Sequence, residues 1–195
     1  MRLAKAGSQR AEPKAGERMR RVRYRVAASL DGYIAGPSGE VDWIVSDPAV
    51  NWNEVYAGVD TVLLGRRTHE LTRKPGAPPW PAGWRVCVFS RTLPSGDRDG
   101  ITFVAADAAA TVAELRAEDG RDIWLFGGGA LAGSLLAARL VDVVEVTIVP
   151  VLLGAGMPLA TGAPQTSLSL TDSRVYPSGI VTLRYEVRHP GTDDA

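Results

Sequence analysis

The stretch Ile123-Trp124-Leu125-Phe126-Gly127-Gly128-Gly129-Ala130-Leu131 decides the fold class. Its apolar start indicates a buried strand, and the three glycines lead into a predicted helix over about residues 130–139. Glycine lets a backbone approach a ligand closely, and the start of a helix offers N–H groups with a partial positive charge. The stretch is therefore a candidate pyrophosphate site. It lacks the G-x-G-x-x-G spacing of a Rossmann fingerprint, and a tight strand-to-helix turn is the alternative interpretation.

Two further strand ends share this chemistry. The segment Leu63-Leu64-Gly65-Arg66-Arg67-Thr68 adds two cations and a hydroxyl to a glycine, and Val88-Phe89-Ser90-Arg91-Thr92 ends a strand with two hydroxyls and an arginine. Arginine pairs well with phosphate oxygens, and the carboxyl ends of parallel strands share one edge of a sheet. The three junctions together predict a site for a dinucleotide that carries an extra 2′-phosphate.

Strand-like runs alternate with helical ones along the rest of the chain. Strands are predicted at 22–29, 61–64, 85–90, 101–104, 123–126, 143–149, 167–175 and 180–187, and helices at 47–57, 66–71, 107–118 and 130–139. Asp47 is the predicted N-cap of the first helix, because Pro48 follows it. The order predicts one α/β domain over residues 22–188, with three layers, a mainly parallel central sheet and an antiparallel C-terminal hairpin.

Composition narrows the possible functions. The 195 residues are 45% hydrophobic and 23% charged with a formal net charge of zero, so no long-range field favours nucleic acid or a membrane surface. One cysteine, Cys87, and two histidines are too few for a disulfide, a thiolate cluster or a typical zinc site, so no metal is expected. His69 is expected on a helix surface. Without an apolar run of about 18 residues, we expect no membrane span and a cytoplasmic location.

The two ends of the chain differ from its middle. Residues 1–21 hold seven lysines and arginines against two glutamates, with almost no large apolar side chains. This composition predicts a disordered basic tail, and an arm that binds nucleic acid is the alternative. Residues 189–195 are predicted to be a second disordered tail.

Five segments resemble the dihydrofolate reductase superfamily. They are Ser29-Leu30-Asp31-Gly32-Tyr33-Ile34-Ala35, Gly65-Arg66-Arg67-Thr68, Ser90-Arg91-Thr92, Phe126-Gly127-Gly128-Gly129 and Pro150-Val151-Leu152-Leu153-Gly154-Ala155-Gly156-Met157-Pro158-Leu159. The chain is most similar to the C-terminal reductase domain of the riboflavin-biosynthesis deaminase-reductase and its stand-alone relatives, over roughly residues 22–187. The resemblance implies a dihydrofolate-reductase-like fold, bound NADPH and hydride transfer to a small heterocyclic or pyrimidine-type substrate, as in 5-amino-6-(5-phosphoribosylamino)uracil reductase. It also implies a homodimer.

The resemblance assigns residues to the cofactor. The arginine turn and the triple-glycine turn hold the NADPH phosphates in the family, which implies Gly65, Arg66, Arg67, Thr68, Gly127, Gly128, Gly129, Ala130 and Leu131 here. The strand end Ser90, Arg91 and Thr92 corresponds to the region of the 2′-phosphate. Ala27, Ile34 and Ala35 correspond to the segments that flank the nicotinamide.

The substrate side follows from the same resemblance. Dihydrofolate reductases place an acidic residue on the first helix and a threonine on a late strand, which makes Asp47 a catalytic candidate and Thr147 a substrate-binding one. A capping role alone is the alternative for Asp47. Asp31, Asp42 and Trp43 lie in the loop expected to cover the pocket, where they either contact substrate or shape turns.

Two departures from the riboflavin branch leave the reaction open. The chain has no Cys-x-x-Cys and no pattern of zinc-binding histidine, which excludes deamination. The Asp-x-Pro segment expected after the second strand is not recognisable in Glu70-Leu71-Thr72-Arg73-Lys74-Pro75. Dihydrofolate reductase activity proper and nucleotide binding without turnover are therefore the alternatives to a riboflavin-type reductase.

Overall fold

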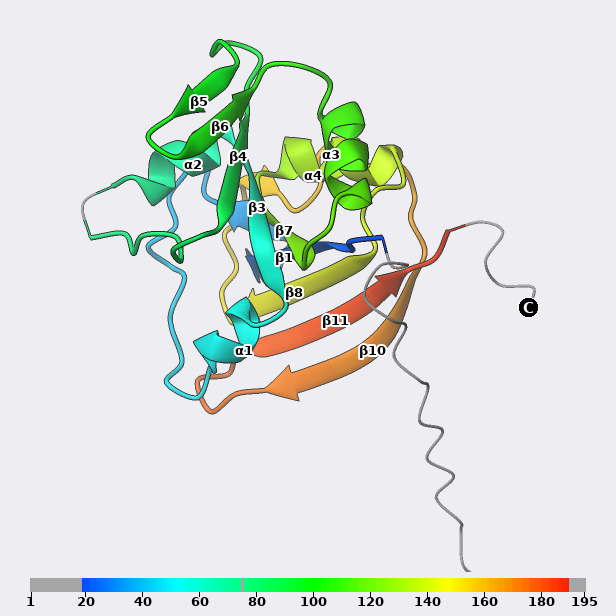
Figure 1. The fold of residues 1–195 in the computed structure, drawn as a ribbon. Helices are drawn as coiled ribbons and strands as arrows, with labels where there is room; N and C mark the ends of the chain where they lie inside the picture. The colour runs from blue at the N-terminus through cyan, green and yellow to red at the C-terminus, as the bar shows by residue number, and fades with distance from the viewer. Residues whose placement is uncertain (1–18, 75, 190–195) are drawn as a thin grey trace, which may run out of the picture.

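The computed structural model describes residues 19–74 and 76–189. Its elements, in chain order, are β1 (Val22–Ser29), β2 (Tyr33–Ala35), α1 (Trp52–Tyr56), β3 (Val59–Gly65), α2 (Arg66–Thr72), β4 (Arg85–Phe89), β5 (Gly96–Arg98), β6 (Ile101–Val104), α3 (Ala108–Ala117), β7 (Asp122–Gly127), α4 (Gly129–Ala137), β8 (Val143–Val149), β9 (Met157–Pro158), β10 (Leu168–Val175) and β11 (Val181–Val187). Within this described part, nine strands form one sheet in the order β10-β11-β8-β1-β7-β3-β4-β6-β5, and β2 pairs with β9 (Figure 1).

The middle of the large sheet is parallel and its two edges are antiparallel. Strand β1 runs parallel to β7 and β8, and β3, β4, β6 and β7 continue the parallel pairing. On one edge β11 and β10 run antiparallel, and on the other edge β5 does. The predicted fold class, a mainly parallel sheet with an antiparallel C-terminal hairpin, is confirmed. The short strands β2, β5 and β9 were not predicted.

The two faces of the sheet have different cores. Alternate residues of a strand face opposite sides, so Leu63 packs with the helix residues Val112 and Leu135, whereas Val62 and Leu64 pack with side chains that include Trp80 and Trp84. Figure 1 shows α3 and α4 side by side, away from α1. The face opposite α3 and α4 is covered mainly by loops, and it provides the cleft described below.

The first helix is shorter than predicted. It begins at Trp52, because the side chain of Asn51 accepts a hydrogen bond from the N–H of Asn53 and serves as the N-cap. Asp47 instead sits in a turn that the N–H of Val50 closes on the Asp47 carbonyl. The prediction that Asp47 caps this helix is therefore wrong.

The ordered contacts also begin before the predicted boundary at residue 22. Arg20 is buried, pairs with Asp60, and donates to the hydroxyl of Thr61 over 2.6 Å. Full pairing allows a guanidinium to be buried. Arg21 pairs with Glu186. The remainder of the predicted N-terminal tail, residues 1–18, and residues 190–195 of the C-terminal one lie outside the described residues.

His69 is likewise buried rather than on the helix surface. It lies edge-on to Phe103 with ring centroids 5.6 Å apart. Burial and the nearby Arg73 lower the pKa of His69 below its ordinary value.

Candidate active site

A cleft of about 1040 Å³ lies on the loop-covered face of the sheet. Its volume is at the upper end of the range of ordinary ligand sites, roughly 300–1,000 Å³. Strands β1, β7, β8 and β11 provide its floor, the segment from residue 38 to residue 55 provides one wall, and the start of α2 and the end of β7 line one end. The cleft therefore has a loop-and-turn end and a strand floor.

The glycine turns predicted at the ends of β3 and β7 meet at this end. A Cβ atom added to Gly65 would lie 3.8 Å from the backbone nitrogen of Gly128 and 3.9 Å from the carbonyl oxygen of Gly127. Gly127 has φ +150°, a conformation that favours glycine, and the Gly127–Gly128 peptide bond is cis. Gly128 is the N-cap of α4 and has no side chain to cap it. Two turns 62 residues apart in sequence thus bring bare backbone together at one place.

The rest of the triple-glycine segment has a packing role. A Cβ atom on Gly129 would lie 2.2 Å from the carbonyl oxygen of Pro158, and the carbonyl of Gly129 accepts from the N–H of Thr161 over 2.9 Å. Leu131 is buried in the core and Ala130 is exposed. None of these three residues lines the cleft, whereas Gly127 and Gly128 do.

The cations after Gly65 lie along the cleft with the glycine turns. Arg66, Arg67 and Thr68 all line it. Arg66 donates to Glu70 over 2.5 Å. Arg67 is exposed and has no ion-pair partner among the described residues. Its charge is therefore available to an anionic ligand.

The third predicted junction does not line the cleft. Its strand lies beside β3, with Phe89 opposite Gly65. The hydroxyl of Ser90 accepts from the N–H groups of Thr92 and Leu93, at 3.2 and 3.0 Å, and so shapes the turn. Arg91 and Thr92 are exposed. Of the three junctions that were expected to form one site, the structure brings two to the cleft and leaves the third outside it.

The residues expected beside the nicotinamide all line the cleft. Ala27 lies on β1 opposite Thr147 of β8, and Ile34 and Ala35 belong to β2, which pairs with β9 through Met157. Thr147 lines the cleft too, with its Oγ1 3.2 Å from Oγ1 of Thr182. The structure thus brings these predicted residues together on the floor and one wall.

Asp47 lines the cleft, but its carboxylate is already bonded. It accepts from the N–H of Ala49 over 2.8 Å and from the N–H of Ser178 over 3.0 Å. Hydrogen bonds from Ser178 and Ala49 hold the pKa of Asp47 below its ordinary value. An ionised carboxylate in this position ties the loop to the β10–β11 turn, which agrees with a structural role rather than with proton donation.

The other acidic loop residues shape turns outside the cleft. Asp31 accepts from the hydroxyl of Ser29 over 2.6 Å and from the N–H of Gly154 over 2.7 Å, and these contacts, led by that of Ser29, lower its pKa. Asp42 is exposed in a turn, and Nε1 of Trp43 donates to the carbonyl of Glu40 over 3.1 Å. Neither Asp31, Asp42 nor Trp43 lines the cleft.

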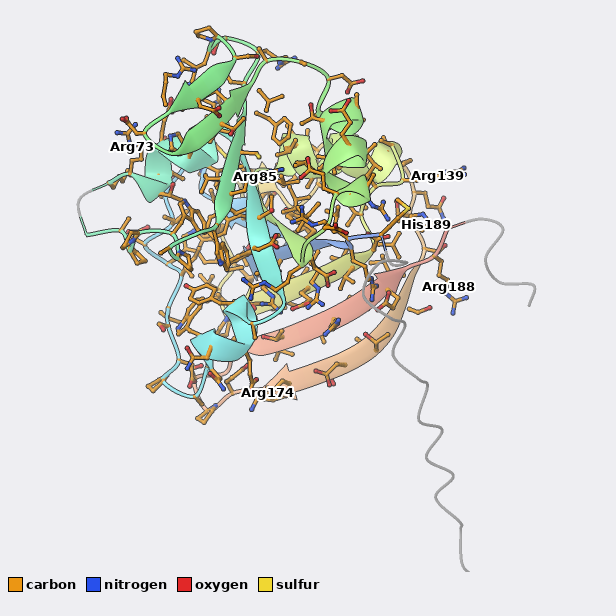
Figure 2. The ribbon with its side chains drawn as sticks, in the orientation of Figure 1. Arg73, Arg85, Arg139, Arg174, Arg188 and His189 are labelled. Atoms are coloured by element: carbon orange, nitrogen blue, oxygen red, sulfur yellow. The ribbon has the colours of Figure 1, made fainter. Side chains whose placement is uncertain are left out.

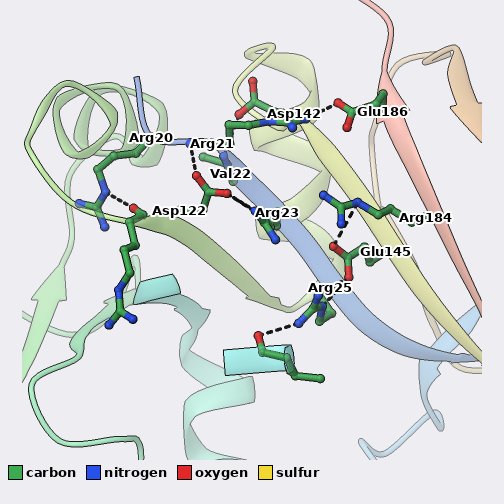
Figure 3. Close-up of polar contacts among 12 residues, drawn as sticks. Arg20, Arg21, Val22, Arg23, Arg25, Asp122, Asp142, Glu145, Arg184 and Glu186 are labelled. Atoms are coloured by element: carbon green, nitrogen blue, oxygen red, sulfur yellow. Dashed lines mark hydrogen bonds and ion pairs between the residues drawn. The ribbon is translucent and has the colours of Figure 1, made fainter. Parts of the chain in front are cut away.

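One charged group on the floor of the cleft was not predicted from the sequence. Glu145 of β8 is 5% exposed and lies between Arg25 of β1 and Arg184 of β11 (Figure 3). Arg25 also donates to the carbonyl of Val55 over 2.7 Å. Farther out, Arg174 of β10 projects near α1, 3.7 Å from Glu54 (Figure 2). A glutamate within the apolar run Val143-Val144-Glu145-Val146 was the available signal.

Aromatic side chains form part of the wall. Trp52, Trp124 and Phe126 line the cleft, and Trp124 packs against Trp84 and Trp80 with ring centroids 6.2 and 6.1 Å away. Flat rings of this kind suit a flat ligand and exclude water. In the described part of the chain we find neither a group of three or more metal-binding side chains nor a helix long and apolar enough to cross a membrane.

Comparison with known proteins identifies the family of this chain. The family model of the RibD C-terminal domain matches residues 20–182. The chain belongs to this family. The uncharacterized protein YyaP of Bacillus subtilis (strain 168) is 32% identical over 180 residues, covering 86% of this chain and 95% of YyaP.

Solved structures agree with this assignment. A structure from Shewanella sp. PV-4, named for riboflavin biosynthesis, superposes with a TM-score of 0.73 and 27% identity, covering 88% of this chain and 100% of that chain. Dihydrofolate reductase from Enterococcus faecalis, solved with NADP(H), gives a TM-score of 0.64 and 16% identity over 87% of this chain and 97% of its own. The latter likeness confirms the dihydrofolate-reductase-like fold.

Proposed function

We propose that this RibD-type domain is an NADPH-dependent reductase of a small heterocyclic or pyrimidine-type substrate, similar to 5-amino-6-(5-phosphoribosylamino)uracil reductase. The observation that supports it is the meeting of the Gly65 and Gly127–Gly128 turns beside Arg66, Arg67 and Thr68 in one cleft. Bare backbone and adjacent cations are the two requirements of a pyrophosphate site.

The residues present fit a phosphorylated dinucleotide. Gly127 and Gly128 line the cleft without side chains, the Gly65 turn lies against them, and α4 starts without a side-chain cap. The two arginines and Thr68 would hold phosphate oxygens, while Ala27, Ile34 and Ala35 would border the reacting ring. When bound, the cofactor supplies a hydride for an electron-poor carbon of the substrate.

The chain itself orients the reactants and keeps water out. Trp52, Trp124 and Phe126 give the cleft apolar walls, which favour a flat substrate and a dry reaction site. Asp47 keeps the covering loop against the β10–β11 turn through its bond to Ser178. In this proposal Asp47 is a positioning residue and not the proton donor. A homodimer stays a prediction that sedimentation of the purified protein tests.

Cofactor titration tests the proposal. Each charge-assisted hydrogen bond to the 2′-phosphate contributes roughly 1.5–3 kcal/mol, so NADPH should bind at least about tenfold tighter than NADH. In this proposal Arg67 also reaches the 2′-phosphate, which NADH lacks. Replacing Arg67 with methionine, which keeps the apolar stem but removes the charge, should therefore remove about tenfold of NADPH affinity and little NADH affinity. Equal affinities of the wild-type protein for both nucleotides would contradict the assignment.

A substrate panel separates a reductase from a binding protein. NADPH oxidation is followed with the ribosylated aminouracil intermediate of riboflavin synthesis, with dihydrofolate and with a simple quinone. Oxidation that depends on the pyrimidine supports the proposal, and oxidation with dihydrofolate alone favours dihydrofolate reductase activity proper. Tight NADPH binding without oxidation by any acceptor would identify a nucleotide-binding protein without turnover.

A further inference from the structure

The carboxylate of Glu145 is buried, but only one of its two oxygens accepts a hydrogen bond. Its Oε2 accepts from Nε of Arg25 over 2.6 Å, whereas its Oε1 has no hydrogen-bond partner among the described residues. Nε of Arg184 is 3.7 Å from that Oε1, which is beyond hydrogen-bond distance. A buried charged oxygen without a donor is costly, and native proteins rarely keep one without a reason. Because Glu145 lines the cleft, a ligand N–H group can supply the missing donor.

The other carboxylates along the cleft do not share this arrangement. Both oxygens of Asp47 accept backbone N–H groups. Glu70 pairs with Arg66, and Glu54 is mostly exposed to solvent, with 68% of its side chain accessible. Asp172 is exposed on β10. Among the described residues that line the cleft, Glu145 is therefore the one buried carboxylate with an oxygen left to accept.

The neighbours of Glu145 define what the ligand should offer. In the pairing of β8 with β11, Arg184 lies opposite Glu145 and Thr182 lies opposite Thr147, so donors and an acceptor sit on one patch of floor. A cationic ligand would face the guanidinium groups of Arg25 and Arg184, and an anionic one would face the carboxylate of Glu145. A neutral ring that presents an N–H group next to a carbonyl matches both partners, with Trp124 and Phe126 nearby to pack on it.

We propose that Glu145 is a substrate-binding residue of this cleft, and that Glu145 and Arg184 together bind the lactam edge of a neutral heterocycle. Oε1 of Glu145 accepts from the ring N–H, and the guanidinium of Arg184 donates to the adjacent ring carbonyl. Arg25 holds the carboxylate in place from the other side (Figure 3). This inference rests on the proposed reductase function, since it assigns the substrate end of the same cleft.

Ligand methylation tests the proposal on the wild-type protein. Uracil, which has lactam N–H groups, and 1,3-dimethyluracil, which has none, are titrated by ligand-observed NMR with and without NADPH. Uracil should bind at least about tenfold tighter, because a hydrogen bond to a charged group is lost on methylation. Equal binding of the two rings, or no binding of uracil at millimolar concentration, would overturn the proposal. If NADPH fails to bind, the proposed function is overturned. The titrations of uracil and 1,3-dimethyluracil without NADPH would still test the role of Glu145.

Two glutamine variants localise the effect. Glu145→Gln should lower uracil affinity at least about tenfold and remove the difference between uracil and its dimethyl form. The matched control Glu54→Gln removes a carboxylate from the exposed rim of the same cleft and should leave uracil affinity unchanged. Apo melting curves of both variants verify folding. Unchanged uracil affinity in folded Glu145→Gln, or inorganic phosphate competing with uracil at the wild-type site, would overturn the assignment in favour of an anion site at the arginines.

Discussion

The two parts of the cleft are built in different ways. At the turn end, Gly127 and Gly128 expose backbone to the cleft, and the Gly65 turn packs against them. On the strand floor, Glu145 and its two arginines present side chains that partner strands bring together. The turn end could be predicted from local sequence, whereas the floor could not. A site made of backbone groups depends on a few consecutive residues, whereas a site made of side chains on a sheet depends on the register of its strands.

The largest expected effect is a loss of stability at Gly129 that its neighbour Gly128 should not share. Gly129→Ala places a Cβ atom 2.2 Å from a backbone oxygen of Pro158, which cannot move without shifting its segment. We expect it to lower the free energy of unfolding by about 3 kcal/mol, at the upper end of the usual cost of overpacking. In Gly128→Ala the Cβ atom would lie 3.3 Å from Oγ1 of Thr68, a side chain that can rotate. This variant should fold nearly as well and lose NADPH affinity.

Denaturant unfolding and NADPH titration on the same preparations check this pair. Normal NADPH affinity in folded Gly128→Ala would remove the turn from the cofactor site. A Gly129→Ala protein as stable as the wild type would show that the backbone at Pro158 of β9 shifts at little cost, and the contrast between the two glycines would disappear.

A smaller effect, on thermal stability, is expected at Asp47 in the loop that forms one wall of the cleft. Asp47→Asn removes the charge that accepts from Ala49 and Ser178. Because the pKa of Asp47 is lowered in the folded state, its contribution to stability is present above the ordinary value of 3.8 and is lost as pH falls through the folded-state pKa. The variant should therefore melt at a lower temperature near neutral pH, and the difference should shrink in acid. Melting curves across pH measure this.

The pH profile of turnover distinguishes positioning from catalysis at Asp47. If Asp47 only positions the loop, the Asp47→Asn profile keeps the wild-type shape, with a change mainly in KM. Loss of the rate constant kcat with unaltered stability would restore Asp47 as the catalytic acid.

The smallest effect, on NADPH affinity, is expected at the strand end Ser90-Arg91-Thr92. Arg91→Met should weaken NADPH binding by less than about fivefold, because an exposed arginine outside the cleft contributes at most about 1 kcal/mol. The comparison is Arg67→Met, whose residue lines the cleft. A loss at Arg91 as large as that at Arg67, specific for NADPH over NADH, would place the 2′-phosphate at the Ser90 strand end.

The predictions for Asp47, Arg20 and Ser90 differ from the structure for one shared reason. The sequence around Asp47 and Pro48 has the pattern of a helix start, yet the Asp47 carboxylate bonds to Ser178, 131 residues away. Arg20 reads as part of a basic tail but is buried through Asp60 and Thr61 of a distant strand. Ser90 has the right residue type for phosphate, but its hydroxyl closes its own turn. Each of these outcomes depends on a competing partner that local pattern does not reveal.

The sequence by itself determined the class of fold and the turn end of the cleft. The apolar run Ile123 to Phe126 followed by glycines specifies a buried strand, a turn and a helix, because the three signals are consecutive and act through local backbone geometry. That the Gly65 and Gly128 turns lie close together was also predicted, because the carboxyl ends of parallel strands share one edge. Tertiary structure alone decided that Ser90 stays outside the cleft and that Glu145 faces Arg25 across 120 residues. Strand register and loop packing set these contacts, and they result from the whole core rather than from any one segment.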